Sequence, residues 1–363
     1  MLAARLHAFG GIGSLRLEQV ADPVAKEGEA VIRIAAAGLN RADTEFIKGE
    51  YGNAPRADAA MWEEHRFPHI PGLECVGTVE SLGPGVDEFR PGDRVLVHSS
   101  FSCGRCRFCL RGLDNYCEDM RVLGTQTPGL GAFAERIAVP ADRLLALPAG
   151  LGFIEAASIG VQIATVLWMM RERAAVERDD IVLVQGASGG VGIAALRVAR
   201  MLGARPVAVV RHREKASLLL EQGAEAVIVD DGETSISEQL RALHPQGADV
   251  VVETVGGPVW PQSMAAVAQG GTIVVCGGHA GVVVPLDLGR VFAKQLDIVG
   301  SARAPKATVR DAIRLVAEGE LGMPVDRIYP FAAIHDALRR MEEGHHVGKI
   351  VIVMDEEAAR ATR

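Results

Sequence analysis

The most specific chemical pattern in the chain is a cysteine cluster in the segment FSCGRCRFCLRGLDNYC. Its members follow the spacing C-x2-C-x2-C-x7-C and are Cys103, Cys106, Cys109 and Cys117. Four thiolates in one short loop can enclose Zn²⁺ as a tetrahedron, leaving no position for water or substrate, which is typical of a structural site. An iron–sulfur cluster is the nearest alternative, because four thiolates also hold those. Cys75 and Cys276 lie far away in sequence, and we expect them to be small buried residues.

A second pattern, IVLVQGASGGVG at residues 181–192, is an apolar strand that runs into glycines and then into a helix. Glycines permit a tight turn and let backbone N–H groups approach a pyrophosphate, while the start of the helix adds partial positive charge. An ordinary strand-to-helix turn is the alternative, which four clustered glycines disfavour. The pattern predicts a dinucleotide site formed by Gly186, Ser188, Gly189, Gly190, Val191 and Gly192.

The end of the following strand indicates which nucleotide binds. A site for NAD places an acidic residue there, which holds the ribose 2′-hydroxyl. Here the strand PVAVV is followed by RHREK, and Arg211, Arg213 and Lys215 are suited to attract a 2′-phosphate. We therefore expect NADP(H), with a solvated start of a helix as the alternative interpretation of these charges.

Two kinds of element must position these groups. Short β-branched segments separated by Gly and Pro fill the first part of the chain, for example at 30–35, 76–79 and 94–97, and they predict a mostly β domain. From about Asp180, strands alternate with helices, which predicts a parallel, doubly wound sheet. We expect an α/β protein with a β-rich domain at 1–150, a nucleotide domain at 151–306 entered by a helix at 152–173, and a return to the first domain over about 307–363.

Composition narrows the class of protein. The chain has 363 residues, enough for two domains at roughly 150 residues each, and 48% of them are hydrophobic. Its formal charge is −8 and no long Lys/Arg block occurs, which argues against nucleic acid as a partner. No signal peptide is evident, and we expect no stretch to reach the ~20 apolar residues of a membrane span. We therefore expect a cytoplasmic protein with reduced thiols and a small-molecule substrate.

Taken together, several motifs make the chain resemble the zinc-containing alcohol dehydrogenase and quinone oxidoreductase family of the medium-chain dehydrogenase/reductase superfamily. The resemblance covers essentially the full length and rests on AAGLNRAD, PHIPGLECVGTVESLGPGV, FRPGDRV, the cysteine segment, GASGGVG and GKIVIV. It implies a GroES-like catalytic domain, a Rossmann domain and a cleft between them, in a homodimer or homotetramer. It also makes Thr165, Cys276, Gly277 and Lys349 candidates for contact with the cofactor.

The catalytic zinc of the alcohol dehydrogenases in this family is implied to be missing. Their ligands are a Cys in GxCxxD, a His in GHE, and a Cys or acidic residue in the helix that enters the Rossmann domain. The corresponding positions here are Asn40, Leu73 and Val161, none of which suits zinc. Glu74 remains but cannot make a site alone; ligands elsewhere among the ten histidines are the alternative.

Without a Lewis acid, hydride transfer to an activated C=C bond is easier than alcohol oxidation, because charge collects on a conjugated oxygen that hydrogen-bond donors can stabilise. The zinc-free relatives, quinone oxidoreductases and enoyl-thioester reductases, use NADPH. The resemblance places Asn40 as an oxyanion or positioning donor and Tyr51, in IKGEYG, as a proton donor. For both residues a structural role is the alternative.

Three functions remain open at this point: a reductase of an enone, quinone or enoyl thioester, a zinc-independent alcohol or carbonyl dehydrogenase, and a non-catalytic NADPH-binding protein of crystallin type. The segment between Tyr51 and Pro71 is longer than in compact relatives. Trp62 and Phe67 in it are candidates for an apolar lid over the site, with a surface excursion or subunit contact as the alternative.

Overall fold

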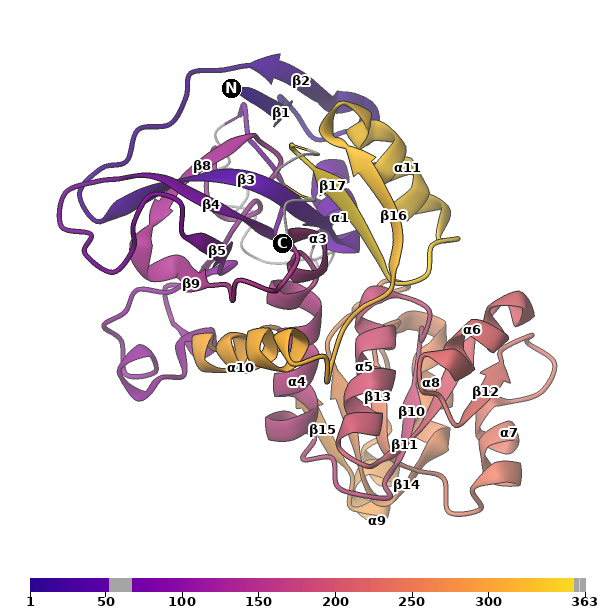
Figure 1. The fold of residues 1–363 in the computed structure, drawn as a ribbon. Coiled ribbons are helices and arrows are strands. Elements are labelled where there is room, and N and C mark those ends of the chain that lie inside the picture. Colours follow the sequence, from indigo (N-terminus) through magenta and orange to yellow (C-terminus); the bar gives the residue numbers. More distant parts are fainter. Residues whose placement is uncertain (52–66, 356–358, 360–363) are drawn as a thin grey trace.

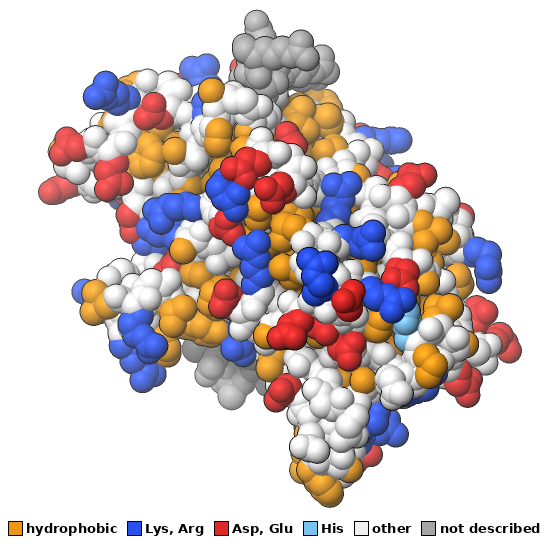
Figure 2. Space-filling view, turned by 60° about the horizontal axis from the view of Figure 1, so that its bottom comes forward, with side chains coloured by type: hydrophobic (Ala, Val, Ile, Leu, Met, Phe, Trp, Pro, Cys, Tyr) orange, Lys and Arg blue, Asp and Glu red, His pale blue; other side chains and the backbone are white. Residues whose placement is uncertain are grey.

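The structure of the chain is a computed structural model that describes residues 1–51, 67–355 and 359. Two domains are joined by a long helix (Figure 1). The face shown in Figure 2 carries basic and acidic side chains interspersed with hydrophobic ones, so that face has no extended area of a single charge.

The first domain is built on a mainly antiparallel seven-stranded sheet. Its strand order is β16-β17-β3-β4-β5-β9, and β8 also pairs with β3. The strands are β3 (Glu29–Leu39), β4 (Cys75–Leu82), β5 (Arg94–Val97), β8 (Arg136–Pro140), β9 (Leu144–Ala146), β16 (Val325–Pro330) and β17 (Lys349–Val353). The β-branched segments singled out in the sequence are therefore strands, and the expectation of a β-rich domain is confirmed.

Smaller elements surround this sheet. Beside it lie the hairpin β1 (Leu2–Leu6) and β2 (Leu15–Gln19), and the pair β6 (Ser100–Phe101) and β7 (Arg121–Val122). The helices α1 (Arg41–Lys48) and α11 (Ile334–Glu343) pack against each other. Figure 1 shows the last part of the chain, α11 with β16 and β17, lying beside the first strands of the sequence.

The second domain is a six-stranded parallel sheet in the order β12-β11-β10-β13-β14-β15. This is the Rossmann order, in which a ligand binds where the order reverses, between β10 and β13. The strands are β10 (Ile181–Val184), β11 (Arg205–Val210), β12 (Ala226–Val229), β13 (Ala248–Glu253), β14 (Val267–Val275) and β15 (Asp297–Gly300). The expected doubly wound fold is confirmed.

Helices cover both faces of the parallel sheet, so its central strands are buried on both sides and consist almost entirely of Val, Ile, Leu and Ala. These helices are α5 (Gly190–Met201), α6 (Ala216–Glu221), α7 (Ile236–Leu243), α8 (Trp260–Ala266) and α9 (Leu288–Lys294).

A continuous helix, Phe153–Arg173, leads from the first domain into the second. It comprises α3 (Phe153–Ala156), a π-helical turn at Ile159–Ile163, α4 (Ala164–Trp168) and a second π-helical turn at Met169–Arg173, and α10 (Lys306–Ala317) packs across it. By length and mean hydropathy, 1.5, it could cross a membrane, which corrects the expectation that no segment qualifies. However, 83% of the most apolar part of this helix is buried inside the protein, which is equally typical of a helix in a protein core.

Candidate functional site

The four clustered cysteines converge on one point. Their Sγ atoms all lie within 4.8 Å of one another, and two short helical turns, Cys109–Arg111 and Asp114–Tyr116, bring the chain back between the third and fourth. Backbone N–H groups point at the sulfurs, as from Cys106 to Cys103 Sγ at 3.3 Å. Hydrogen bonds from the backbone of Cys109 and Glu118 lower the pKa of the Cys106 thiol to about 6. Burial instead raises the pKa of the Cys109 thiol to about 12. Four sulfurs that converge on one point, with no position left open, suit a structural metal ion.

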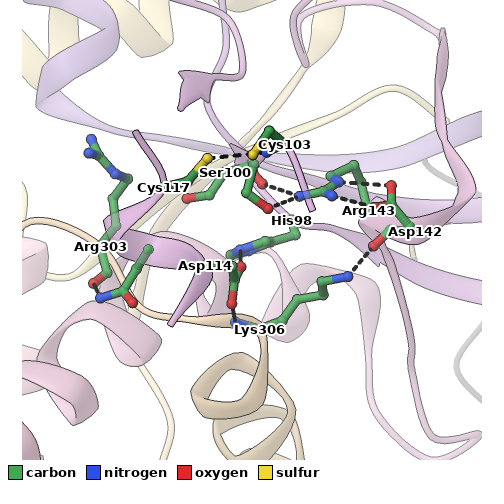
Figure 3. Close-up of polar contacts among 11 residues, drawn as sticks. His98, Ser100, Cys103, Asp114, Cys117, Asp142, Arg143, Arg303 and Lys306 are labelled. Atoms are coloured by element: carbon green, nitrogen blue, oxygen red, sulfur yellow. Dashed lines mark hydrogen bonds and ion pairs between the residues drawn. The ribbon is translucent and has the colours of Figure 1, made fainter. Parts of the chain in front are cut away.

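Polar contacts tie this lobe to the rest of the protein (Figure 3). Asp114 Oδ1 accepts from the backbone N–H of Lys306 at 3.0 Å, at the start of α10, and Asn115 Nδ2 donates to the Arg303 carbonyl at 3.2 Å. His98 faces Asp114, with 3.5 Å between Nε2 and Oδ2, and burial lowers the pKa of His98. The lobe therefore anchors the start of the helix that packs on the connecting helix.

The predicted dinucleotide loop connects β10 to α5. Gly186 has φ +64°, which favours glycine, and a Cβ on Gly192 would lie 2.6 Å from the Gly186 carbonyl oxygen. The turn and the close helix packing therefore both require glycine. Gly186, Ser188, Gly189, Gly190 and Val191 keep exposed surface, whereas Gly192 is buried at the contact between the helix and the loop.

The other cofactor candidates lie in several elements around this loop. Cys276 and Gly277 directly follow β14, whereas Thr165 is almost fully buried in α4. Arg211 and Arg213 follow β11 and are exposed. Lys215 is nearly buried, and its Nζ donates to the Gly344 carbonyl at 2.8 Å, in the chain segment just before β17. Burial lowers the pKa of Lys215.

A buried polar network surrounds Asn40, one of the positions where the resemblance implies a ligand of the catalytic zinc. It joins Asn40 at the end of β3, Glu74 just before β4, Gln162 in the π-helical turn and Lys349 at the start of β17. Lys349 Nζ is paired with Glu74 Oε1 and donates to Asn40 Oδ1 at 3.1 Å. Gln162 Nε2 also donates to Asn40 Oδ1, at 3.1 Å, and the Val161 N–H donates to Glu74 Oε2 at 3.0 Å.

The direction of these hydrogen bonds fixes how Asn40 is used. Lys349 can only donate and the Glu74 carboxylate can only accept, so the Asn40 oxygen must face Lys349 and its amide nitrogen must face Glu74. That nitrogen donates to Glu74 Oε1 at 3.1 Å and to the Gly38 carbonyl at 3.2 Å. Both amide hydrogens are thus bonded within the protein. Asn40 holds the network together here, rather than offering a free donor to an oxyanion.

The Lys349 side chain is used within this network. Its side chain is completely buried in the first domain and bonded to the network, so in this structure it presents no surface for the direct cofactor contact expected from the sequence. A long side chain can be buried with its charge only when an opposite charge and hydrogen bonds compensate it, which Glu74 and Asn40 provide.

The remaining positions around the network hold no metal ligand set. Leu73 is buried and Val161 contributes only its backbone N–H. Within the described residues, the four cysteines are the one group of three or more His, Cys, Asp or Glu side chains arranged to hold a metal ion. Asp43 accepts from the backbone N–H groups of Asn40 and Leu73, at 2.8 and 3.1 Å, and its burial raises the pKa of this carboxyl to about 7.

Tyr51 follows Gly49, the residue that ends α1, and packs partly buried against the core of the first domain. Phe67 packs edge-on against Phe9, with 5.1 Å between ring centroids, so it belongs to that core. Trp62 lies outside the described residues, and with it most of the lid expected from the sequence.

Sequence reasoning missed two residues. One is Gln162, because an isolated glutamine in an apolar helix carries no sequence signal for a functional role. His279 Nδ1, in the segment after β14, lies 2.9 Å from Glu45 Oε1 on α1 and so connects the two domains beside the site. Only the folded chain shows that these positions face one another.

Comparison with known proteins agrees with this architecture. Residues 26–149 match the alcohol dehydrogenase GroES-like domain and residues 190–318 the zinc-binding dehydrogenase domain. The chain is 31% identical to an acryloyl-coenzyme A reductase of Sulfurisphaera tokodaii, over 93% of this chain and 96% of that one, and 26% identical to a quinone oxidoreductase of Sus scrofa, over 98% of both. A solved NAD-dependent alcohol dehydrogenase superposes with a TM-score of 0.89 at 32% identity, over 98% of this chain and 100% of the other. The chain is therefore an oxidoreductase enzyme that belongs to the alcohol dehydrogenase and quinone oxidoreductase family of the medium-chain dehydrogenase/reductase superfamily.

Proposed function

We propose that this oxidoreductase uses NADPH to reduce the activated C=C bond of an enoyl thioester, an enone or a quinone. The observation that carries the proposal is the state of the three positions where the family places catalytic zinc ligands. Asn40 is held in the buried network with Glu74 and Lys349, Leu73 is a buried aliphatic residue, and Val161 contributes only its backbone N–H. Alcohol oxidation depends strongly on a Lewis acid. Reduction of a conjugated double bond instead needs donors near a conjugated oxygen and a source of one proton. The similarity to an acryloyl-coenzyme A reductase supports the thioester as the first substrate class to test.

The preference for NADPH rests on the exposed Arg211 and Arg213 at the end of β11, where an NAD enzyme places an acidic residue. The guanidinium group binds phosphate through two parallel hydrogen bonds, which makes arginine well suited to a 2′-phosphate. We also propose one zinc ion per chain, held by Cys103, Cys106, Cys109 and Cys117, with a structural role.

The bound nicotinamide supplies the hydride. The glycine loop and the start of α5 would hold the pyrophosphate, and so the dinucleotide, at the reversal of strand order. When the β-carbon of the substrate gains a hydride, the electron pair of the C=C bond moves onto the carbonyl oxygen. The α-carbon of the resulting enolate then takes one proton, which we assign to the Tyr51 phenol, protonated at neutral pH.

The first experiment follows the oxidation of NADPH with a short 2-enoyl-CoA, a 2-enone and 1,4-naphthoquinone, and in parallel the reduction of NADP⁺ by primary and secondary alcohols. The proposal expects turnover on the first panel. Turnover on alcohols alone would establish the zinc-independent dehydrogenase, and nucleotide binding without turnover on either panel would establish a non-catalytic protein.

Tyr51→Phe tests the proton donor. Loss of a general acid typically costs about 10²-fold in rate, so kcat on the enoyl thioester should fall by about that factor while the affinity for NADPH stays unchanged. Naphthoquinone reduction should be less affected, because a hydroquinone anion can take its proton from water. A kcat close to that of the wild type on the thioester would remove Tyr51 from the mechanism.

A further inference from the structure

A segment of the first domain lies against the predicted 2′-phosphate site of the second. It is the loop at 344–348, between α11 and β17, and the Gly344 carbonyl accepts the Lys215 ammonium at 2.8 Å. Beside this contact the His345 ring faces the ring of His212, which follows β11, with 6.5 Å between ring centroids and 42° between ring planes. Both histidines are exposed, so both rings are accessible to a ligand.

We propose that His345 and His212 together bind the 2′-phosphate of NADP(H) across the boundary between the domains. One phosphate oxygen that accepts hydrogen bonds of about 2.8 Å from a nitrogen of each ring fits between two imidazoles at this separation. The two rings come from different domains, so a 2′-phosphate held in this way links the loop at 344–348 to the end of β11. The inference rests on the proposed use of NADPH and adds a recognition residue, His345, that lies 130 positions beyond the end of the basic cluster at 211–215 in the sequence.

The charges around the two rings favour an anion. On the side of the second domain, Glu214 Oε1 lies 3.8 Å from His212 Nδ1 and is the acidic group paired with that ring. The charged groups that act on the neighbouring Lys215, Asp231 and His346 are Arg211, Arg213 and Glu214 from the second domain and Arg340, Asp326 and Arg41 from the first, and Glu343, next to Gly344, acts on Arg340.

Two of these neighbours are already engaged within the first domain. Asp326 accepts two hydrogen bonds of 3.1 Å from Arg340, so its charge is compensated. His346 is a different case from His345: it is nearly fully buried, and its burial lowers the pKa to about 4, which keeps this imidazole neutral. The cations near the exposed rings are therefore those of the second domain, Arg211, Arg213 and Lys215.

The test compares His345→Ala and His212→Ala with the wild type in calorimetric binding of NADPH, NADH, 2′,5′-ADP and 5′-AMP. His7→Ala serves as the matched control, since His7 is an exposed first-domain histidine paired with Glu18 at 2.8 Å. Each ring variant should weaken NADPH and 2′,5′-ADP by about tenfold, as expected for one charge-assisted hydrogen bond, and change NADH and 5′-AMP by less than twofold. His7→Ala should change none of them.

Three outcomes decide the matter. A His345→Ala variant that keeps the wild-type ratio of NADPH to NADH affinity overturns the inference, as does an equal loss on all four nucleotides. A wild-type protein that binds NADH as tightly as NADPH overturns instead the proposed cofactor preference. If His345→Ala fails to fold, His345→Gln takes the same test and should weaken NADPH and 2′,5′-ADP while it changes NADH and 5′-AMP by less than twofold.

Discussion

Replacement of Lys349 by methionine should destabilise the protein more than most single substitutions. Methionine keeps much of the length of the side chain but removes the ammonium group, so Glu74 is left as a carboxylate with 3% of its side chain exposed and no cation beside it. Glu74 would retain hydrogen bonds from Asn40 Nδ2 at 3.1 Å and from the Val161 N–H at 3.0 Å. These two bonds reduce the cost of the unpaired charge but do not neutralise it.

Removal of one partner from a buried ion pair costs about 3 to 5 kcal/mol. We expect Lys349→Met to lie in this range, measured as the change in free energy of unfolding by urea with circular dichroism as the probe. Glu74→Gln alone should also destabilise the protein, because it leaves the ammonium group of Lys349, which is fully buried, without its carboxylate. The double variant should lose less than the sum of the two single losses, by more than about 1 kcal/mol, because it buries no unpaired charge.

Two results would refute this reasoning. One is a Lys349→Met variant within about 1 kcal/mol of the wild type, and the other is additive behaviour of the two substitutions. Lys48→Met is the matched control, because Lys48 forms an ion pair with Glu342 at 2.7 Å on the surface and should cost less than about 1 kcal/mol.

Three further predictions concern separate parts of the protein. Elemental analysis of protein purified without chelator should give one zinc per chain, and Cys106→Ala should lower the melting temperature much more than the initial kcat. The pKa of the Asp43 carboxyl is about 7 in the folded protein and about 3.8 in the unfolded chain, so between these pH values only the folded state binds this proton. The free energy of unfolding should therefore fall as the pH rises from about 4 to 7, and Asp43→Asn should reduce this pH dependence. Phe292 on α9 and Ile298 on the edge strand β15 expose apolar side chains, and we propose that this edge pairs with a second copy of the chain. The wild type should then sediment as a dimer in analytical ultracentrifugation, and Phe292→Glu with Ile298→Lys as a monomer.

The parts of the site that the sequence predicted well are those built from neighbouring residues. The cysteine cluster and the glycine loop each lie within a short segment, and local geometry brings their members together whatever the rest of the chain does. The alternation of strands and helices also predicted the Rossmann sheet, because parallel strands buried on both faces are almost purely apolar.

The polar network could not be predicted from the sequence, because its residues lie far apart in the chain. Asn40 and Lys349 meet because β17 pairs antiparallel with β3, with Ile350 opposite Leu39, and a shift of that register by one residue would turn Lys349 to the other face of the sheet. Gln162 donates its hydrogen bond to Asn40 from a π-helical turn, and no local sequence pattern predicts that turn. The sequence therefore indicated which metal ligands are absent but not what replaces them.

The place of β17 in the first sheet has a consequence for how the chain is made. This strand lies between β16 and β3, so the half of β3 from Ala36 to Leu39 has no neighbour on that side until residue 353 has been synthesised. All strands of the second domain have been synthesised by Gly300, before β17 exists. This domain can therefore fold during synthesis before the first domain is complete. Until then this part of β3 is an unpaired, apolar sheet edge, the kind of edge at which incomplete chains can associate with one another.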